Sequence, residues 1–168
     1  MSVLRGDLLK DIRVVLAGSP PVTIRERLQE LGATLGGESA AEPPQMLVFD
    51  ARPAFGGGGT ERLRRSLEAA WSSIHAVAIA ALIPSAEPTK IVIVAPAANA
   101  GALAAAARAG LENLARTLSV EWARYEITTT AILPGAQTSD AQLAELVSYL
   151  ASPAGNYFNG CRFELGGL

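Results

Sequence analysis

Short apolar runs alternate along the chain with longer segments in which apolar residues recur at helical spacing. Most of the runs are rich in β-branched residues and end at glycine or proline, which is typical of strands buried on both faces of a parallel sheet. They predict strands at 11–18, 45–51, 90–96, 127–135 and 160–167. The third run, KIVIVAP, gives the strongest strand signal.

Helical periodicity fills most of the intervals between these strands. It predicts helices at 21–33, 60–82, 103–125 and 139–152. We expect Gly32 to end the first helix, Thr60 to cap the second, and Ser139 or Asp140 to cap the fourth. Strands that alternate with helices predict an α/β fold with a parallel sheet and right-handed crossovers.

The two central helices combine an apolar stripe with small residues on the opposite side. The stripe of 103–125 comprises Leu103, Ala107, Leu111, Leu114, Leu118, Trp122 and Tyr125. Opposite it lie Ala105, Ala106, Ala109 and Gly110, and the helix at 60–82 has Ser72, Ser73 and Ala76 in the same role. Such faces allow another helix to approach closely.

Composition and charge narrow the class of protein. The chain has 168 residues, 49% of them hydrophobic, which is enough for a single domain over 1–168. A net charge of -2 with scattered Lys and Arg argues against a nucleic-acid partner. A lone Cys161 excludes an internal disulfide and a cysteine-based zinc site. Without a signal peptide or a membrane-spanning run, we expect a cytoplasmic protein.

Three blocks in the second half of the chain occur in the order found in the short-chain dehydrogenase/reductase family. They are KIVIVA, RAGLENLARTLSVEWARYEITTTAILPG and ELVSYLASPAGNYFNGCRFELGG. Upstream, VVLAG and LQELGATL resemble the family's first β-α-β element, LVFDARP its fourth strand, and SLEAAWSSIHAVAIAALIP the helix that follows. The resemblance implies a reduced Rossmann-like parallel sheet flanked by helices.

The same resemblance places the family's catalytic residues on positions that lack their chemistry. Its tyrosine falls on Ala104, its lysine on Arg108, and its serine within Ala95–Ala98. Alanine cannot relay a proton, and a guanidinium is no substitute for a lysine ammonium that must reach one ribose edge. The resemblance therefore implies that the catalytic set is absent.

The cofactor site of the family is also changed. Gly18 is the only glycine in the first turn, where Pro20 and Pro21 remove two amide donors that a pyrophosphate would need. About ten residues separate GATL from QMLVFD, too few for a further helix and an internal strand. Asp50 would place a carboxylate against the cofactor, and PGAQTSD omits the segment that covers substrate. We expect this chain to bind no cofactor and no metal.

These losses, beside intact helices, indicate a catalytically inactive subunit. We interpret the chain as the partner of a full-length, NAD(P)-binding homologue in a hetero-oligomer, with a heterotetramer expected. The arrangement is similar to heteromeric bacterial members of the family, including hydroxyacyl-CoA dehydrogenases of the hydroxybenzylsuccinyl-CoA type. The candidate interface residues are Trp71, Trp122, Tyr125, Tyr149, Tyr157, Phe158 and the terminal segment Leu165 to Leu168.

Two alternatives remain open at this level. One is a homodimeric scaffold or ligand-binding protein on the same fold. The other is an enzyme of different chemistry that uses Asp50, His75 or Arg108. A lone histidine is more often structural, and the arginines at the start of the helix at 60–82 are more often solvated than bound to an anionic tail.

Overall fold

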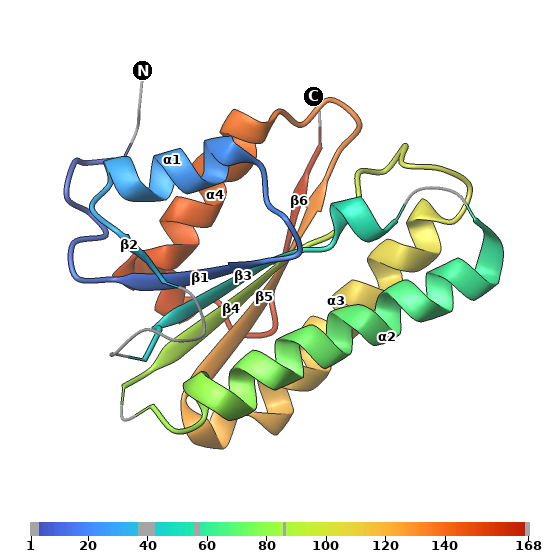
Figure 1. Cartoon of the computed structure of the whole chain (residues 1–168). Helices are drawn as coiled ribbons and strands as arrows, with labels where there is room; N and C mark the ends of the chain where they lie inside the picture. The colour runs from blue at the N-terminus through green and yellow to red at the C-terminus, as the bar shows by residue number, and fades with distance from the viewer. Residues whose placement is uncertain (1–3, 37–42, 56–57, 86, 167–168) are drawn as a thin grey trace.

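The computed structural model describes residues 4–36, 43–55, 58–85 and 87–166. Six parallel strands form one sheet in the order β2-β1-β3-β4-β5-β6 (Figure 1). The strands are β1 (Arg13–Ala17), β2 (Thr34–Gly36), β3 (Met46–Asp50), β4 (Thr89–Val94), β5 (Ile127–Pro134) and β6 (Arg162–Leu165). The predicted α/β class and parallel sheet are confirmed.

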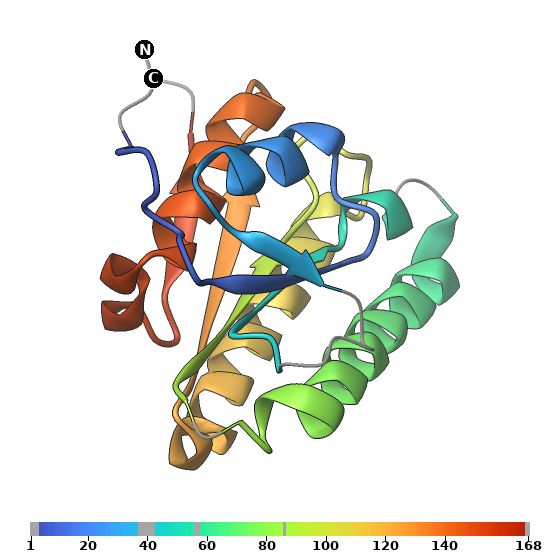
Figure 2. The ribbon, with the colours of Figure 1, turned by 60° about the vertical axis from the view of Figure 1, so that its left-hand side comes forward.

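Helices cover both faces of the sheet. They are α1 (Val22–Glu30), α2 (Gly59–Val77), α3 (Ala104–Glu121) and α4 (Asp140–Ala151). One layer consists of α1 and α4, and the other of α2 and α3 (Figure 2). A π-helical turn, Ala78–Leu82, continues α2. The four predicted helices are therefore all present, and two of them lie on each face.

The central strands are largely apolar because their side chains alternate between two buried layers. In β3, Leu47 and Phe49 pack with α2 and α3, whereas Met46 and Val48 pack with α1 and α4. Every residue of β3 is buried. A strand buried on both faces cannot show alternation between apolar and polar residues, which explains the continuous runs in the sequence.

The ends of the helices test the expected caps. Ser139 caps α4 and forms a reciprocal capping box with Gln142, as expected. Gly32, with φ +95°, follows the last residues of α1 and lets the chain turn against the backbone of Lys10. The prediction that Thr60 caps α2 is wrong. The N-cap is Gly58 with φ +90°, and no side chain caps this helix.

The edges of the sheet differ from the sequence-based expectation. The hydrophobic pattern does not predict the three-residue edge strand β2. The strand that this chain lacks, relative to the dinucleotide-binding strand order, is also not an internal strand. The dinucleotide-binding order 3-2-1-4-5-6 has its third strand outermost, and the order observed here is that order without the third strand, followed by β6. The hydrogen bonding of the remaining strands is therefore unbroken.

Within the described part of the chain, no helix combines the length and the apolar character needed to cross a bilayer.

Lys90 joins the amino end of β4 to the last turn of α4. Its Nζ donates to the carbonyl oxygen of Ala151 at 3.0 Å and to that of Ser152. These carbonyls belong to the end of a helix, where a cation is favourable. Burial nevertheless lowers the pKa of the Lys90 ammonium to about 8. The folded protein therefore holds this proton less tightly than the unfolded chain.

This difference predicts a pH dependence of stability. Between pH 8 and about 10.4 the unfolded chain binds more protons at Lys90 than the folded protein, so the free energy of unfolding rises with pH in this window. We expect the stability difference between wild type and Lys90→Met to shift by about 1–2 kcal/mol in favour of wild type, a range discounted for partial exposure. Urea unfolding at pH 7 and pH 10 measures it. Lys10→Met controls for the loss of one lysine, and a pH-independent difference would contradict the prediction.

Candidate functional site

The candidate site lies at the carboxyl edge of the sheet, between β1 and β3. The chain leaves β1 toward β2 on one side and enters β3 on the other, so the strand order reverses here. In open α/β sheets this crevice is where ligands bind. Five residues, 135–139, connect β5 to α4 and bring the first residue of α4, Asp140, to the same edge.

Gly18 in the first turn is used for packing between strands. It has φ +77°, and a Cβ built on it would lie 2.1 Å from the carbonyl oxygen of Asp50. The backbone at the end of β3 therefore fills the space beside this glycine. Pro21 is the N-cap of α1, and neither it nor Pro20 has an N–H group to offer a phosphate. These residues do not fit the pyrophosphate of a dinucleotide.

Asp50 ends β3 with a side chain that is only 1% exposed. Its carboxylate accepts hydrogen bonds from the Arg52 backbone N–H at 3.0 Å and from Nη2 of the same residue at 2.8 Å. The Nε of Arg52 also donates to both carboxylate oxygens. The resemblance places Asp50 where its carboxylate would face a cofactor unfavourably. The structure instead pairs it with an arginine two residues away.

Arg52 extends this pair across the crevice to α4. Its Nη1 donates to Oδ1 of Asp140 at 2.8 Å. Burial lowers the pKa of the Arg52 guanidinium, but the hydrogen bonds and charges of Asp50 and Asp140 outweigh burial and hold the pKa above its ordinary value. Two carboxylates and one guanidinium leave one net negative charge, which disfavours a pyrophosphate here.

Arg108 holds the neighbouring strand ends together. It lies one turn after Ala104 on α3 and is 8% exposed. Its Nη1 donates to the carbonyl oxygens of Pro96 and Pro134, which follow β4 and end β5. Its Nη2 lies 3.3 Å from the carboxylate of Glu164 on β6. The guanidinium at the family's lysine position is therefore bound to this chain's own groups.

Alanines occupy the positions of the family's catalytic serine and tyrosine. Ala95 is completely buried and its N–H donates to Ile132, while Ala104 is 5% exposed in the first turn of α3. Neither side chain carries a group that can donate or accept a proton. Within the described ranges, no group of three His, Cys, Asp or Glu residues is placed to hold a metal ion.

His75 lies away from this edge. It is the seventeenth residue of α2, so it lies about 24 Å along the helix axis from the first. Its exposed ring lies tilted beside Trp71, at 4.9 Å between centroids, and beside Trp122, at 6.4 Å. The structure does not bring His75 together with Asp50 and Arg108, and it gives the histidine an aromatic environment on the surface of the α2–α3 layer.

The candidate interface residues differ in accessibility. Tyr157 is 87% exposed and Trp71 is 38% exposed. Tyr149 and Phe158 are half-buried against each other, with 6.1 Å between their rings. The remaining candidates are Tyr125, which is half-buried under the Arg124 guanidinium, Leu165, which is half-buried in the core, and Leu168, which lies outside the described residues.

Two residues assigned to contact faces are used inside the chain. Trp122 is 6% exposed and belongs to the core between the sheet and the α2–α3 layer, so almost none of its surface is free for a partner. Gly110 faces α2, because a Cβ built on it would lie 2.9 Å from a methyl group of Leu67. By contrast, Ala105, Ala106 and Ala109 are exposed, as are Ser72, Ser73 and Ala76.

The sequence analysis missed the link between Arg52 and Asp140, which are 88 residues apart. The spacing of Asp50 and Arg52 could have suggested a local pair. No signal in the sequence points to Asp140, because only the short connection after β5 brings the start of α4 to this edge.

The sheet order and the two helix layers define the fold of the short-chain dehydrogenase/reductases, an α/β Rossmann-like fold. The chain is similar to the citronellol catabolism dehydrogenase AtuB of Pseudomonas aeruginosa PAO1, with a TM-score of 0.76, 17% identity, and coverage of 99% of this chain and 98% of that one. It is also similar to a double mutant of a short-chain dehydrogenase/reductase from Serratia marcescens. That comparison gives a TM-score of 0.74, 19% identity, and coverage of 95% and 98%. No family model matches the sequence, and no curated protein does.

The ion pair at this edge predicts a strong response to loss of Arg52. Arg52→Met leaves the Asp50 carboxylate buried without its partner, and we expect a loss of about 2–4 kcal/mol in the free energy of unfolding. Asp140→Asn removes only the half-exposed partner and should cost less than about 1 kcal/mol. Urea unfolding with circular dichroism measures both.

A double variant separates buried charge from lost packing. Combining Asp50→Leu with Arg52→Met removes both charges and should recover most of the loss. Equal stability of Arg52→Met and wild type would show that the pair does not stabilise the fold.

Proposed function

We propose that this chain is a non-catalytic subunit that assembles with, and stabilises, a full-length NAD(P)-dependent short-chain dehydrogenase. The observation that carries the proposal is the position of Arg108. A lysine at this place in a working site must be free to meet a ribose, whereas Arg108 is buried and bound to two carbonyls and a carboxylate of its own chain.

The crevice supports the same conclusion. The groups that would face a cofactor, Asp50 and Arg52, neutralise each other and are joined to Asp140. A dinucleotide would have to break these contacts and then place its phosphates beside two carboxylates. The proposal therefore assigns NAD(P) to the partner subunit.

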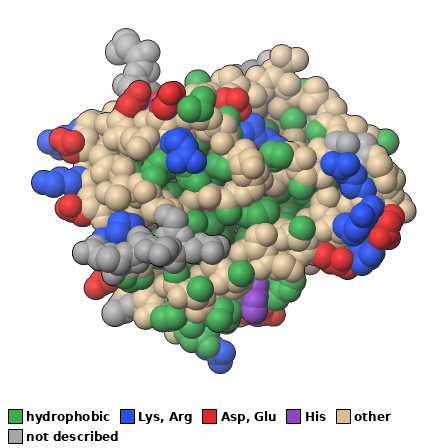
Figure 3. Space-filling view, viewed as in Figure 1, with side chains coloured by type: hydrophobic (Ala, Val, Ile, Leu, Met, Phe, Trp, Pro, Cys, Tyr) green, Lys and Arg blue, Asp and Glu red, His purple; other side chains and the backbone are tan. Residues whose placement is uncertain are grey.

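The outer surface of the α2–α3 layer supports association. Its exposed residues include a set of small side chains on both helices, and exposed Ile79 and Val120 add apolar area at 51% and 77% exposure. Charged side chains gather at the start of α2, at the right-hand end of Figure 3, and α3 carries exposed Arg116 and Glu121. Small side chains permit close packing of helices, and burial of apolar area stabilises a subunit contact. The heteromeric hydroxyacyl-CoA dehydrogenases that the sequence resembles are the model for this arrangement.

Co-purification tests the assembly. When the chain is expressed with an intact homologue from the same source, we expect a stable hetero-oligomer on size-exclusion chromatography. Ala109→Glu places a charge on the exposed face of α3 and should abolish co-purification, because an unpaired carboxylate is costly to bury. Ala141→Glu is the matched control, since this exposed alanine lies on α4, across the sheet. A stable homodimer that does not associate with the homologue would contradict the proposal and favour the alternative of a homodimeric scaffold.

Titration with nicotinamide cofactor tests whether the partner subunit, and not this chain, binds NAD(P). The purified chain should show no saturable binding of NADH or NADPH by fluorescence in the micromolar range, whereas the complex should bind. Micromolar affinity for the chain alone, or oxidation of an alcohol by it, would refute the proposal.

A further inference from the structure

A cavity of about 350 Å³ lies between the first turns of α2 and α3. Its wall is largely apolar, and the side chains that line it include Ala54, Phe55, Leu63, Leu103, Ala104 and Ala107. The first turns of both helices and the connections that precede them form this wall. The volume lies within the range of small-molecule sites, about 300–1,000 Å³.

Small side chains on α3 leave this space open. Ala104 and Ala107 are 5% and 1% exposed, and they offer only methyl groups where larger apolar side chains would fill the space. A water molecule takes about 30 Å³ of the liquid, so the volume suits a ligand of roughly a dozen non-hydrogen atoms. Removing apolar surface from water is favourable in free energy, so a largely apolar wall favours a hydrophobic ligand.

Arg62 adds a charge to the lining of this cavity. Its side chain is exposed, and its Nε donates a long hydrogen bond, 3.4 Å, to the carbonyl oxygen of Ala54. The next two arginines lie close to Glu61, and Arg64 also pairs with Glu68. Among the described residues, no carboxylate pairs with Arg62. The positive end of α2 lies at the same place, so the potential favours an anion.

We propose that this cavity binds a small hydrophobic carboxylate. The apolar body lies against Phe55, Ala104 and Ala107, and the carboxylate meets the Arg62 guanidinium. A neutral ligand of the same shape leaves this guanidinium unused, and an amine is repelled by it. The site needs neither a partner subunit nor a reaction, so it is independent of the function proposed above.

Calorimetric titration of the full chain with octanoate, 1-octanol and octylamine tests the chemistry. If the chain is purified with a partner, the same complex is used for every variant. We expect octanoate to bind most tightly and octylamine most weakly. Equal affinities for octanoate and 1-octanol would overturn the role of Arg62, and no binding by any of the three would overturn the site.

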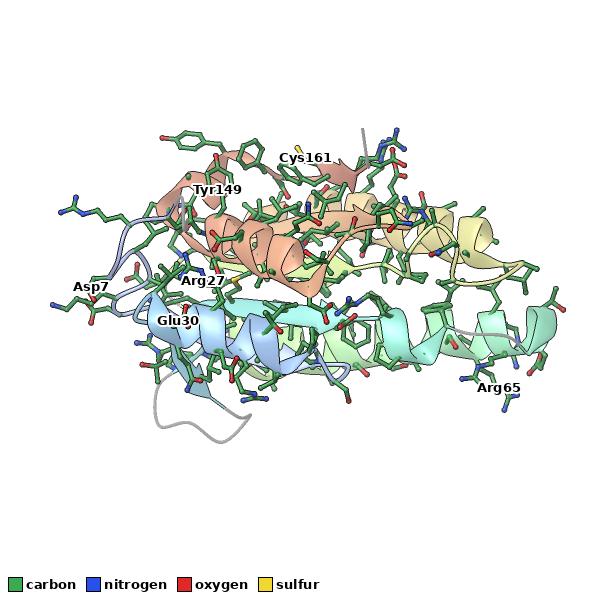
Figure 4. All side chains as sticks on the ribbon, turned by 90° about the horizontal axis from the view of Figure 1, so that it is seen from above. Asp7, Arg27, Glu30, Arg65, Tyr149 and Cys161 are labelled. Atoms are coloured by element: carbon green, nitrogen blue, oxygen red, sulfur yellow. The ribbon has the colours of Figure 1, made fainter. Side chains whose placement is uncertain are left out.

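Charge variants locate the carboxylate. Arg62→Gln should weaken octanoate binding by about three- to tenfold and leave 1-octanol unchanged. Arg65→Gln is the matched control, because Arg65 projects from the same end of α2 without lining the cavity (Figure 4). Equal losses in the two variants would show a general charge effect, and the assigned contact would be wrong.

A filled cavity tests the location independently of charge. Ala104→Leu should weaken octanoate and 1-octanol alike by more than about tenfold, whereas Ala105→Leu, on the exposed side of the same helix, should change neither. If thermal unfolding shows that Ala104→Leu is not folded, Ala102→Leu at the exposed rim serves instead. Unchanged affinities in a folded variant would place the ligand elsewhere.

Discussion

The central parallel sheet must be covered on both faces, and the rest of the structure depends on this constraint. The connections between parallel strands carry their helices to the two faces, and here each face receives two helices. The same topology directs every strand to end at one edge. Groups that follow the strands are therefore collected there, however far apart they are in the chain.

What collects at that edge is a set of charges that pair with one another. Asp50 and Arg52 form a buried ion pair, Asp140 extends it to α4, and Arg108 binds the carbonyls at the ends of β4 and β5. A buried charge is tolerated when its hydrogen-bonding capacity is satisfied. In this protein the crevice between β1 and β3, where ligands bind in related folds, is occupied by the chain's own charged side chains.

The positions of these residues show how far sequence reasoning reaches. Ala104 and Arg108 could be placed on the long helix from sequence, but the tertiary structure decides that the guanidinium binds the carbonyls of Pro96 and Pro134. Trp122 was placed both on the apolar stripe of its helix and among the interface candidates, and its side chain lies in the core. Gly110 was assigned to the outer side of α3, yet it packs against Leu67. Helical periodicity places a residue on one face of a helix only to within about one position. Packing against the neighbouring helix decides which residues at the border of that face are buried.

The sequence by itself determined the α/β class, the order of the four helices and of five of the six strands, and a cap at Ser139 or Asp140. These follow from local periodicity and from hydrogen bonds between residues close in the chain. The tertiary structure alone decided the pairing of Arg52 with Asp140, the use of Lys90 to bind the end of α4, and the cavity between α2 and α3. Each of these joins segments far apart in sequence, and their contact depends on how the helices pack across the sheet, which no local pattern records.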